Sequence, residues 1–201
     1  MVYKFTHRLE YKEGEVTGIR LIVGICGASG VQYGIELLKT LKEEKIETHL
    51  VLSEWAETVI QEETSYNASD LRVLADFSYG YFQMDAAIAS SSFLVDGMII
   101  CPSTVATVSK IAIADTANLI VRAADNMLKM HKPLVVAIRE TPLSPPCLKN
   151  LYELATSGAI VIPLAPGFYH MPKNIDELIA FMVGKILDAL GIPNQKYKRW
   201  K

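Results

Sequence analysis

The chain has 201 residues, 50% of them hydrophobic, with 20 basic and 22 acidic side chains. This length suits one α/β domain with a sizeable core, and the near-neutral charge argues against a nucleic-acid-binding surface. No apolar run approaches the about 20 residues of a membrane span, and the first ten residues lack the apolar core of a signal peptide.

The cysteines and histidines predict neither disulfides nor a metal site. Cys26, Cys101 and Cys147 are odd in number and far apart in the sequence, so a disulfide framework is not expected. The four histidines are scattered and no Cys-x-x-Cys motif occurs. We therefore expect a metal-free, cytoplasmic protein.

Residues 1–18 differ in pattern from the rest of the chain. Charged side chains alternate there with aromatic and aliphatic ones, and Lys12–Glu15 has the composition of a turn. A short hairpin is one interpretation of this segment. We treat residues 1–18 as an N-terminal extension and residues 19–201 as a single domain.

The domain opens with a predicted strand, a small-residue loop and a helix. Residues 19–25 form an apolar run typical of a strand buried on both faces, and residues 31–41 carry leucines at helical spacing. Gly27 and Gly30 permit a tight turn, whose free N–H groups at a helix N-terminus favour a phosphate. The loop lacks the G-x-G-x-x-G spacing of dinucleotide-binding proteins, so a plain connection and a capping role for Ser29 stay open.

Strands and helices alternate along the remaining sequence. Strands are predicted at 47–52, 95–101, 133–138 and 159–163, and helices at 54–63, 105–113, 119–131, 146–157 and 174–190, the last capped by Asn174 with Glu177. Residues 71–74 read as a short strand, 77–82 as a loop and 89–93 as a small-residue loop. The alternation predicts a three-layer, Rossmann-like or flavodoxin-like α/β fold: a mostly parallel sheet with helices on both faces.

Polar or charged groups follow the carboxyl ends of five predicted strands. They are Gly27-Ala28-Ser29, Ser53, Ser103-Thr104, Arg139-Glu140 and Tyr169-His170. Ligands of parallel sheets bind outside these strand ends, near the topological switch point. Each group alone suits turn chemistry, but five together predict a phosphate-bearing ligand in one crevice.

A series of motifs across residues 19–200 resembles the UbiX family of flavin prenyltransferases. The motifs are Gly27-Ala-Ser-Gly-x-x-Tyr-Gly34, Ser53, Cys101-Pro-Ser-Thr104, Asn118-Leu-Ile-x-Arg-Ala-Ala-Asp125, Lys129, Arg139-Glu-Thr-Pro142, Gly167-Phe-Tyr-His170, Leu187-Asp-Ala-Leu-Gly-Ile192 and Arg199-Trp200. The resemblance implies FMN binding and metal-independent transfer of a dimethylallyl group from dimethylallyl monophosphate to flavin N5 and C6. It also implies a homo-oligomer, from trimer to dodecamer, with sites at subunit interfaces, and a UbiD-type decarboxylase as recipient of the prenylated FMN.

The resemblance also assigns roles to individual residues. Those expected to bind FMN are Gly27, Ala28, Ser29, Ser53, Thr104, Val105, Ala106, Thr107, Arg122 and Arg139. Those expected to bind the prenyl phosphate are Glu63, Lys129, Arg139, Glu140, Tyr169, Lys185 and Trp200. Because phosphate departure leaves an allylic cation, cationic side chains and phenols must neutralise the phosphate. Glu140 is the expected acid/base, with Ser29 and Lys129 as further catalytic residues.

Several of these residues have ordinary structural interpretations. Glu140 also suits a salt-bridged carboxylate at a strand end, and Glu63 a solvated helix end. Arg122 and Lys129 share one helical face with Asp125, which alone is more typical of a solvated surface. The basic tail, residues 196–201, also suits a frayed end.

Other functions stay open at this point. Lys185 stands where the family typically has Arg, and so lacks the bidentate fork. Ala117 replaces a usual Asp or Asn. An FMN-dependent oxidoreductase, a cysteine decarboxylase of a related fold, and a non-catalytic FMN-binding protein are the alternatives.

Overall fold

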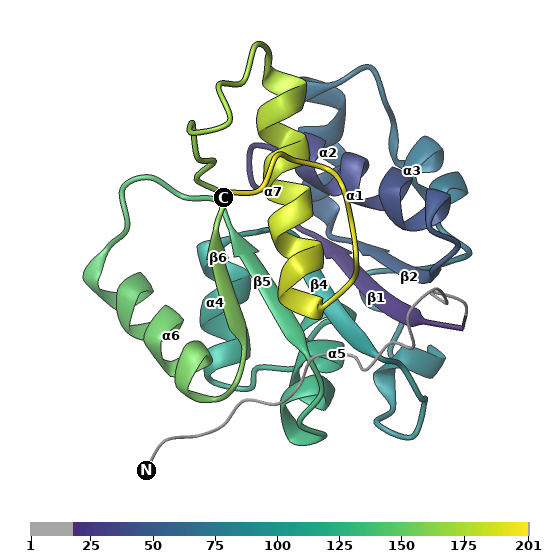
Figure 1. The fold of residues 1–201 in the computed structure, drawn as a ribbon. Helices are drawn as coiled ribbons and strands as arrows, with labels where there is room; N and C mark the ends of the chain where they lie inside the picture. The colour runs from purple at the N-terminus through teal and green to yellow at the C-terminus, as the bar shows by residue number, and fades with distance from the viewer. Residues whose placement is uncertain (1–17, 201) are drawn as a thin grey trace.

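The computed structural model describes residues 18–200 (Figure 1), so the hairpin considered for the N-terminal segment lies outside the described residues. Within this range, strands and helices alternate as predicted. The elements are β1 Arg20–Ile25, α1 Val31–Glu43, β2 Glu47–Leu52, α2 Glu54–Glu63, α3 Ala68–Leu74, β3 Phe77–Tyr79, η1 Ala87–Ala89, β4 Gly97–Ser103, α4 Val105–Ala112, α5 Leu119–Lys129, β5 Leu134–Ile138, α6 Pro145–Thr156, β6 Ile160–Pro163 and α7 Ile175–Leu190.

The strands form one six-stranded sheet in the order β3-β2-β1-β4-β5-β6. Every neighbouring pair is parallel, and β1 pairs with β2 without interruption from Arg20 opposite Glu47 to Ile25 opposite Leu52. The chain moves outward in opposite directions from β1 and β4, so the switch point lies between these two strands. This confirms the predicted doubly wound, Rossmann-like fold.

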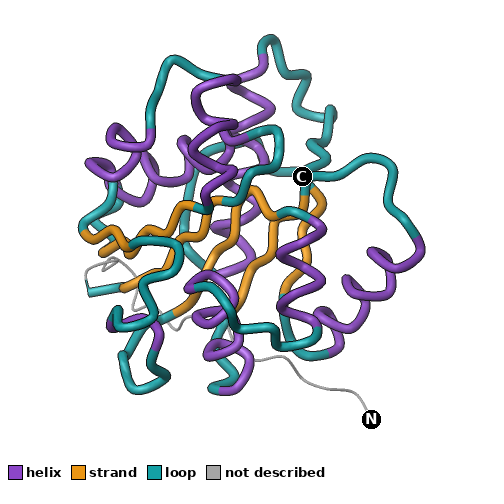
Figure 2. Tube along the Cα trace, turned by 180° about the vertical axis from the view of Figure 1, so that it is seen from behind, coloured by secondary structure: helices purple, strands orange, loops and turns teal. Residues whose placement is uncertain are grey.

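Helices cover both faces of the sheet and bury its central strands. α1, α2, α3 and α7 share one core with Leu21 and Val23 of β1, and α4, α5 and α6 share the other with Ile22. Successive side chains of a strand point to opposite faces, so the apolar run of β1 supplies both cores. Figures 1 and 2 show α7 in front of the sheet and α5 behind it.

Gly34 sets the distance between α1 and the sheet. A Cβ atom at this position would lie 2.5 Å from the carbonyl oxygen of Cys101 and 2.9 Å from Ile25. No side chain fits there, so α1 packs with its backbone directly over β4 and β1. This packing places the N-terminus of α1 beside the carboxyl ends of the central strands.

Two predictions between residues 65 and 92 were wrong. Residues 71–74 belong to helix α3, where Asn67 and Asp70 form a reciprocal capping box. Phe77–Tyr79, expected in a loop, forms the edge strand β3 by pairing with residues 49–51 of β2. The capping pair was a local signal for the helix, whereas β3 depends on a partner strand.

β4 lies two residues further along the chain than the predicted strand 95–101. It continues past Cys101 because the carbonyl of Pro102 accepts a hydrogen bond from the Cys26 N–H (3.0 Å), and that of Ser103 accepts one from the Arg139 N–H (3.2 Å). These two bonds join the end of β4 to the residues that follow β1 and β5. The proline read as a strand end therefore lies inside the sheet.

The cap of α7 is confirmed in part. The Asn174 side chain accepts a hydrogen bond from the Glu177 N–H (2.9 Å), as expected for an N-cap. The Glu177 carboxylate accepts its bond from the N–H of Lys173 (2.9 Å) instead of that of Asn174. Both bonds still satisfy donors at the start of the helix.

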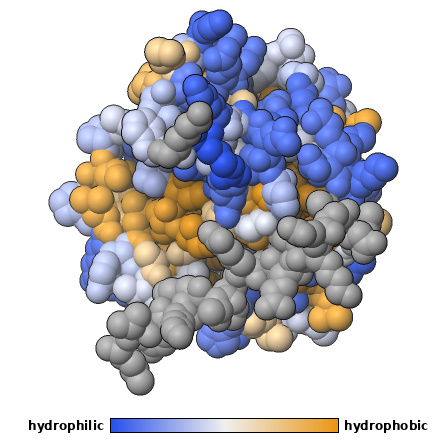
Figure 3. Space-filling model, in the orientation of Figure 1, coloured by the Kyte–Doolittle hydropathy of each residue, from blue (hydrophilic) through white to orange (hydrophobic). Residues whose placement is uncertain are grey.

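The edge formed by β6 leaves apolar surface uncovered. Residues 160–162 are only half-buried, and Leu148 of α6 is exposed. Figure 3 shows hydrophobic surface beside α7, over β6 and α6. Within residues 18–200, no helix combines the length and apolarity needed to cross a membrane.

Candidate functional site

The N-termini of three helices meet the carboxyl edge of the sheet, which we call the rim. α1, α2 and α4 each begin directly after β1, β2 and β4. Ser53 caps α2 by accepting from the Ala56 N–H (3.2 Å), and Thr104 caps α4 by accepting from the Thr107 N–H (3.1 Å). Their aligned peptide dipoles give the rim a positive potential that favours anions.

The peptide group between Ser29 and Gly30 is hydrogen-bonded at both ends. Its carbonyl accepts from Nε of Arg139 (3.0 Å), and its N–H donates to Oε2 of Glu63 (2.7 Å). Gly30 is the N-cap of α1 at φ 92°, a left-handed conformation that favours glycine. The capping role considered for Ser29 was therefore wrong. Its exposed hydroxyl has no hydrogen-bond partner among the described residues.

A buried chain of side chains joins the loop after β1 to α4. Sγ of Cys26 lies 3.3 Å from Oγ1 of Thr107, which lies 3.0 Å from Oγ1 of Thr104. Burial raises the pKa of the Cys26 thiol to about 11, so it stays protonated at neutral pH. Val105 and Ala106, also expected to bind FMN, form the first turn of α4, whose N–H groups have no partner within a helix.

Gly27 and Ala28 hold the loop close to α2. A Cβ at Gly27 would lie 2.4 Å from Cβ of Trp55, so only glycine allows this approach. Ala28 is buried. These two residues therefore bring the backbone of the loop to the rim and contribute no polar side chain.

Arg139 and Glu140 follow β5 at the rim, and neither side chain forms an ion pair among the described residues. The Arg139 guanidinium bonds Ser29 through Nε only, and its two terminal nitrogens have no partner in the part of the chain that the structure describes. The exposed Glu140 carboxylate accepts from the N–H of Thr141 (3.0 Å). No basic side chain of residues 18–200 pairs with Glu140, so the salt-bridge interpretation has no support. The two free terminal nitrogens of Arg139 have the geometry that binds a phosphate group through two parallel hydrogen bonds.

Tyr169, Lys185 and Trp200 belong to one aromatic cluster on the α7 side of the sheet. The Tyr169 ring meets Trp200 edge to face at 5.2 Å between centroids, and Phe181 at 5.7 Å. Nζ of Lys185 lies 5.1 Å from the Tyr197 ring centroid. The sequence did not single out Phe181 or Tyr197, because no local pattern shows that three segments converge there.

His170 lies inside the same cluster. Its ring stacks on Phe181, with centroids 4.9 Å apart and planes 3° from parallel. Both ring nitrogens are buried and have no hydrogen-bond partner among the described residues. These two nitrogens are exceptions to the rule that buried polar atoms are hydrogen-bonded.

Arg122 and Lys129 lie apart from the other predicted site residues. Both stand on α5, which covers the opposite face of the sheet from α7. Lys129 pairs with Asp125 at 2.7 Å and precedes the start of β5, whereas Arg139 follows its end. One chain therefore does not bring Lys129 together with Arg139, Tyr169 and Lys185.

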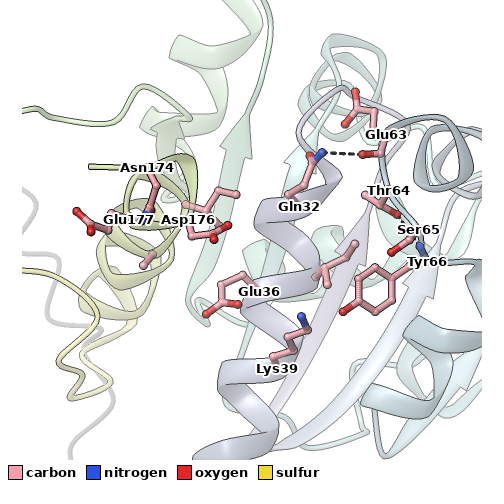
Figure 4. A pocket seen from close by; sticks show the side chains of 13 residues that line it. Gln32, Glu36, Lys39, Glu63, Thr64, Ser65, Tyr66, Asn174, Asp176 and Glu177 are labelled. Carbon is pink, nitrogen blue, oxygen red and sulfur yellow. Dashed lines mark hydrogen bonds between the residues drawn. The ribbon is translucent and has the colours of Figure 1, made fainter. Parts of the chain in front are cut away.

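A separate cleft of about 720 Å³ opens between α1, the end of α2 and α7 (Figure 4). Glu63 is the one predicted site residue that lines it, and its carbonyl accepts from Nε2 of Gln32 (3.2 Å). The charged side chains of its lining are Glu36, Lys39, Glu63, Asp176 and Glu177. An excess of carboxylates repels phosphate, so we place the anion site at the rim.

The described residues hold no group of three or more His, Cys, Asp and Glu side chains arranged for a metal ion.

Comparison with known proteins gives the family. Residues 9–187 match the model of the Flavoprotein family. The chain is 44% identical to flavin prenyltransferase UbiX of Thermoplasma acidophilum over 182 residues, which cover 90% of this chain and 100% of the relative. The chain belongs to the flavin prenyltransferase family.

Solved structures of flavin prenyltransferase relatives share the fold. The crystal structure of AnUbiX (PadA1) in complex with FMN and dimethylallyl pyrophosphate superposes with a TM-score of 0.90 at 40% identity, covering 91% of this chain and 97% of that one. A dodecameric FMN-dependent UbiX-like decarboxylase from Escherichia coli O157:H7 gives a TM-score of 0.89 at 40% identity, covering 91% and 100%. The expected family membership is confirmed.

Proposed function

We propose that this protein transfers a dimethylallyl group from dimethylallyl phosphate to N5 and C6 of reduced FMN, making prenylated FMN for a UbiD-type decarboxylase. The observation that carries the proposal is the presence of two separate groups suited to phosphate. One is the rim, with three helix N-termini and the free fork of Arg139. The other is Lys185 within the aromatic cluster. AnUbiX, which resembles this chain, binds FMN and dimethylallyl pyrophosphate.

The rim residues fit the phosphate of FMN. The rim offers the cationic fork of Arg139, hydroxyl groups and helix N–H groups, with Ser53 and Thr104 as caps and the Ser29 hydroxyl exposed. We assign FMN binding to Gly27, Ala28, Ser29, Ser53, Thr104, Val105, Ala106, Thr107 and Arg139. When bound, reduced FMN supplies the two nucleophilic positions that accept the prenyl carbons.

The aromatic cluster suits the departing phosphate and the allylic cation that its departure leaves. Lys185 and the phenol of Tyr169 supply positive charge and a hydrogen-bond donor for the phosphate. The faces of Tyr169 and Trp200, whose rings meet edge to face, attract positive charge. Lys185 binds as a point charge, because lysine lacks the planar fork of arginine.

Glu140 is assigned as the acid/base. Its carboxylate is exposed beside the free fork of Arg139 and has no basic partner among residues 18–200. In this role it donates a proton to a phosphate oxygen as the bond to carbon breaks, and later accepts one when the new ring closes. Glu63 is fixed by the Gly30 N–H at 2.7 Å and holds the rim loop in place.

Arg122 and Lys129 are assigned to the site of a neighbouring subunit. They lie on the opposite face of the sheet from Lys185, so a second copy of the chain has to supply them. Uncovered apolar surface over β6 and α6 supports an oligomer. The related E. coli protein is dodecameric. We also propose a cytoplasmic location, which the three free, buried cysteines support.

Mass spectrometry of the extracted flavin tests the proposed function. Purified protein is incubated without oxygen with reduced FMN and either dimethylallyl monophosphate or pyrophosphate. We expect the flavin to gain one five-carbon prenyl unit with at least one donor, and no gain when the donor is omitted. Flavin that is bound but unchanged would favour the non-catalytic alternative.

A further inference from the structure

The chain beyond α7 turns back along that helix instead of leaving the molecule. α7 ends at Gly191, which is left-handed at φ 79°, and residues 193–200 form a segment that we call the C-terminal strap. Asn194 contacts the carbonyl of Gly184 (3.3 Å), Tyr197 packs on Phe181 (4.9 Å between centroids), and Trp200 reaches Tyr169. The strap therefore runs antiparallel to α7 (Figure 1), and the frayed end considered from the sequence was wrong for residues 196–200.

One carboxylate on α7 holds this strap. Asp188 accepts two hydrogen bonds from Arg199, at 2.7 and 2.9 Å, one from the Tyr197 hydroxyl at 2.5 Å and one from Asn194 at 2.9 Å. Burial alone would raise the pKa of Asp188, but the hydrogen bonds from Arg199 and Tyr197 outweigh it and hold the pKa below its usual value. The carboxylate is thus charged at neutral pH, when all four bonds are charge-assisted.

The helix itself is shaped to receive the strap. A Cβ at Gly184 would lie 2.5 Å from Cδ1 of Tyr197 and 3.0 Å from Oδ1 of Asn194. Glycine inside a helix costs about 1 kcal/mol relative to alanine, and here it lets the Tyr197 ring lie against the helix backbone. Lys196 adds a bond to Glu36 of α1 at 3.1 Å.

The strap carries Trp200, which the proposed function uses, and contacts Lys185 of α7, which it also uses. Trp200 is 77% exposed, so little besides the strap and its edge contact with Tyr169 fixes its place. The Tyr197 ring centroid lies 5.1 Å from Nζ of Lys185, so this ring restricts the positions that the ammonium group can take. The positions of Trp200 and Lys185 therefore depend on the hydrogen bonds that Tyr197 and Arg199 donate to Asp188.

We propose that Asp188 is a positioning residue: by clasping Arg199 and Tyr197 it sets Trp200 and Lys185 for binding of the prenyl phosphate. The proposal rests on the proposed function for its consequence in catalysis, whereas the clasp itself can be tested without any substrate. A strap that only stabilises the fold would change the free energy of unfolding and leave the KM for the prenyl phosphate unaltered.

The first measurement reports the position of Trp200 in the absence of FMN and substrate. The chain has two tryptophans, so a Trp55→Phe background leaves Trp200 as the single fluorophore. In this background Asp188→Asn should raise acrylamide quenching and lower the fluorescence anisotropy of Trp200. Glu57→Gln is the matched control, because it makes the same chemical change in the exposed ion pair between Glu57 and Arg72.

The second measurement separates positioning from stability. With native tryptophans, Asp188→Asn should raise the KM for dimethylallyl phosphate about tenfold, the factor that corresponds to 1.4 kcal/mol, while FMN affinity stays unchanged. Arg199→Gln should have a similar effect, and the double variant should be no worse than either single one. Gly184→Ala displaces Tyr197 from the helix side and should show the same KM shift.

Unaltered Trp200 quenching in Asp188→Asn would overturn the proposal, as would equal losses of FMN and prenyl phosphate binding. Should wild-type protein fail to prenylate FMN, the proposed function would fall, while the quenching comparison would still decide whether Asp188 holds the strap.

Discussion

At the scale of single residues, the Ser29–Gly30 peptide joins three parts of the rim. Arg139 from β5 binds its carbonyl and Glu63 from α2 binds its N–H, so opposite charges fix the two ends of one peptide plane. Hydrogen bonds to charged groups are about twice as strong as neutral ones. The result is a rigid loop with the hydroxyl of Ser29 facing outward.

Glu140 gives the sharpest prediction at this scale. Glu140→Gln keeps the shape and the bond to the Thr141 N–H but removes the carboxyl group that can donate or accept a proton. We expect kcat to fall about 100-fold, the lower bound usual for general acid–base catalysis, with FMN affinity unchanged. Single-turnover mass spectrometry of the flavin measures the rate.

Glu153→Gln on the exposed side of α6 serves as the control and should behave like the wild type. Full activity of Glu140→Gln would remove Glu140 from the mechanism.

At the scale of elements, the site depends on how closely helices approach the sheet. α1 begins at Gly30 without a side-chain cap, and its first N–H groups reach the rim because Gly34 lets the helix lie against β4. α2 and α4 carry Ser53 and Thr104 as caps at the same edge. The anion site is thus a property of helix placement as much as of side chains.

Gly34→Ala tests this packing. Helix propensity alone would favour alanine by about 1 kcal/mol, but the new Cβ would meet the Cys101 carbonyl at 2.5 Å. Overpacking of this kind costs about 1–3 kcal/mol, so we expect a net loss of stability in chemical denaturation and weaker FMN binding.

Gly80→Ala is the matched control, because its Cβ would have its nearest contact at 3.6 Å. We expect it to change the free energy of unfolding by less than about 0.5 kcal/mol. Equal stability of the two variants would contradict the packing argument.

At the scale of the whole molecule, the sheet separates two sets of cationic residues. Lys185 stands with α7 on one face, while Arg122 and Lys129 stand with α5 on the other. No rotation of side chains brings them together across a sheet with buried central strands. The proposed site, which includes residues of both sets, therefore requires more than one copy of the chain.

Complementation between inactive variants tests this arrangement. Lys129→Ala and Arg139→Ala should each lose most activity alone, because each removes one charge from the phosphate site. When the two variants are co-expressed and form mixed oligomers, activity should return. A Lys129→Ala subunit keeps Arg139 and can receive the intact Lys129 of an Arg139→Ala neighbour. Prenylated FMN formed per oligomer is the measurement.

The pair Arg139→Ala and Glu140→Gln is the control, because both residues follow β5 of the same subunit and no mixture restores a complete site. Failure of the first pair to regain activity would show that Lys129 does not serve a neighbour.

Outside residues 65–92, the sequence by itself determined the order of elements and most of their bounds, and it predicted which residues meet at the rim. Strand 47–52 and helix 54–63 matched β2 and α2 because apolar periodicity is a local signal. The parallel-sheet rule then brought Ser29, Thr104 and Arg139 to one edge without any knowledge of contacts.

Only the tertiary structure decided the edge strand β3, the separation of Lys129 from Arg139 and the course of the C-terminal strap. Each depends on residues distant in the chain: β3 forms on β2, Lys129 is placed by the helix layer that contains α5, and Arg199 meets Asp188 by a reversal of the chain. The local sequence pattern shows which face of an element is apolar, but contacts between residues distant in the chain determine which other element packs against that face.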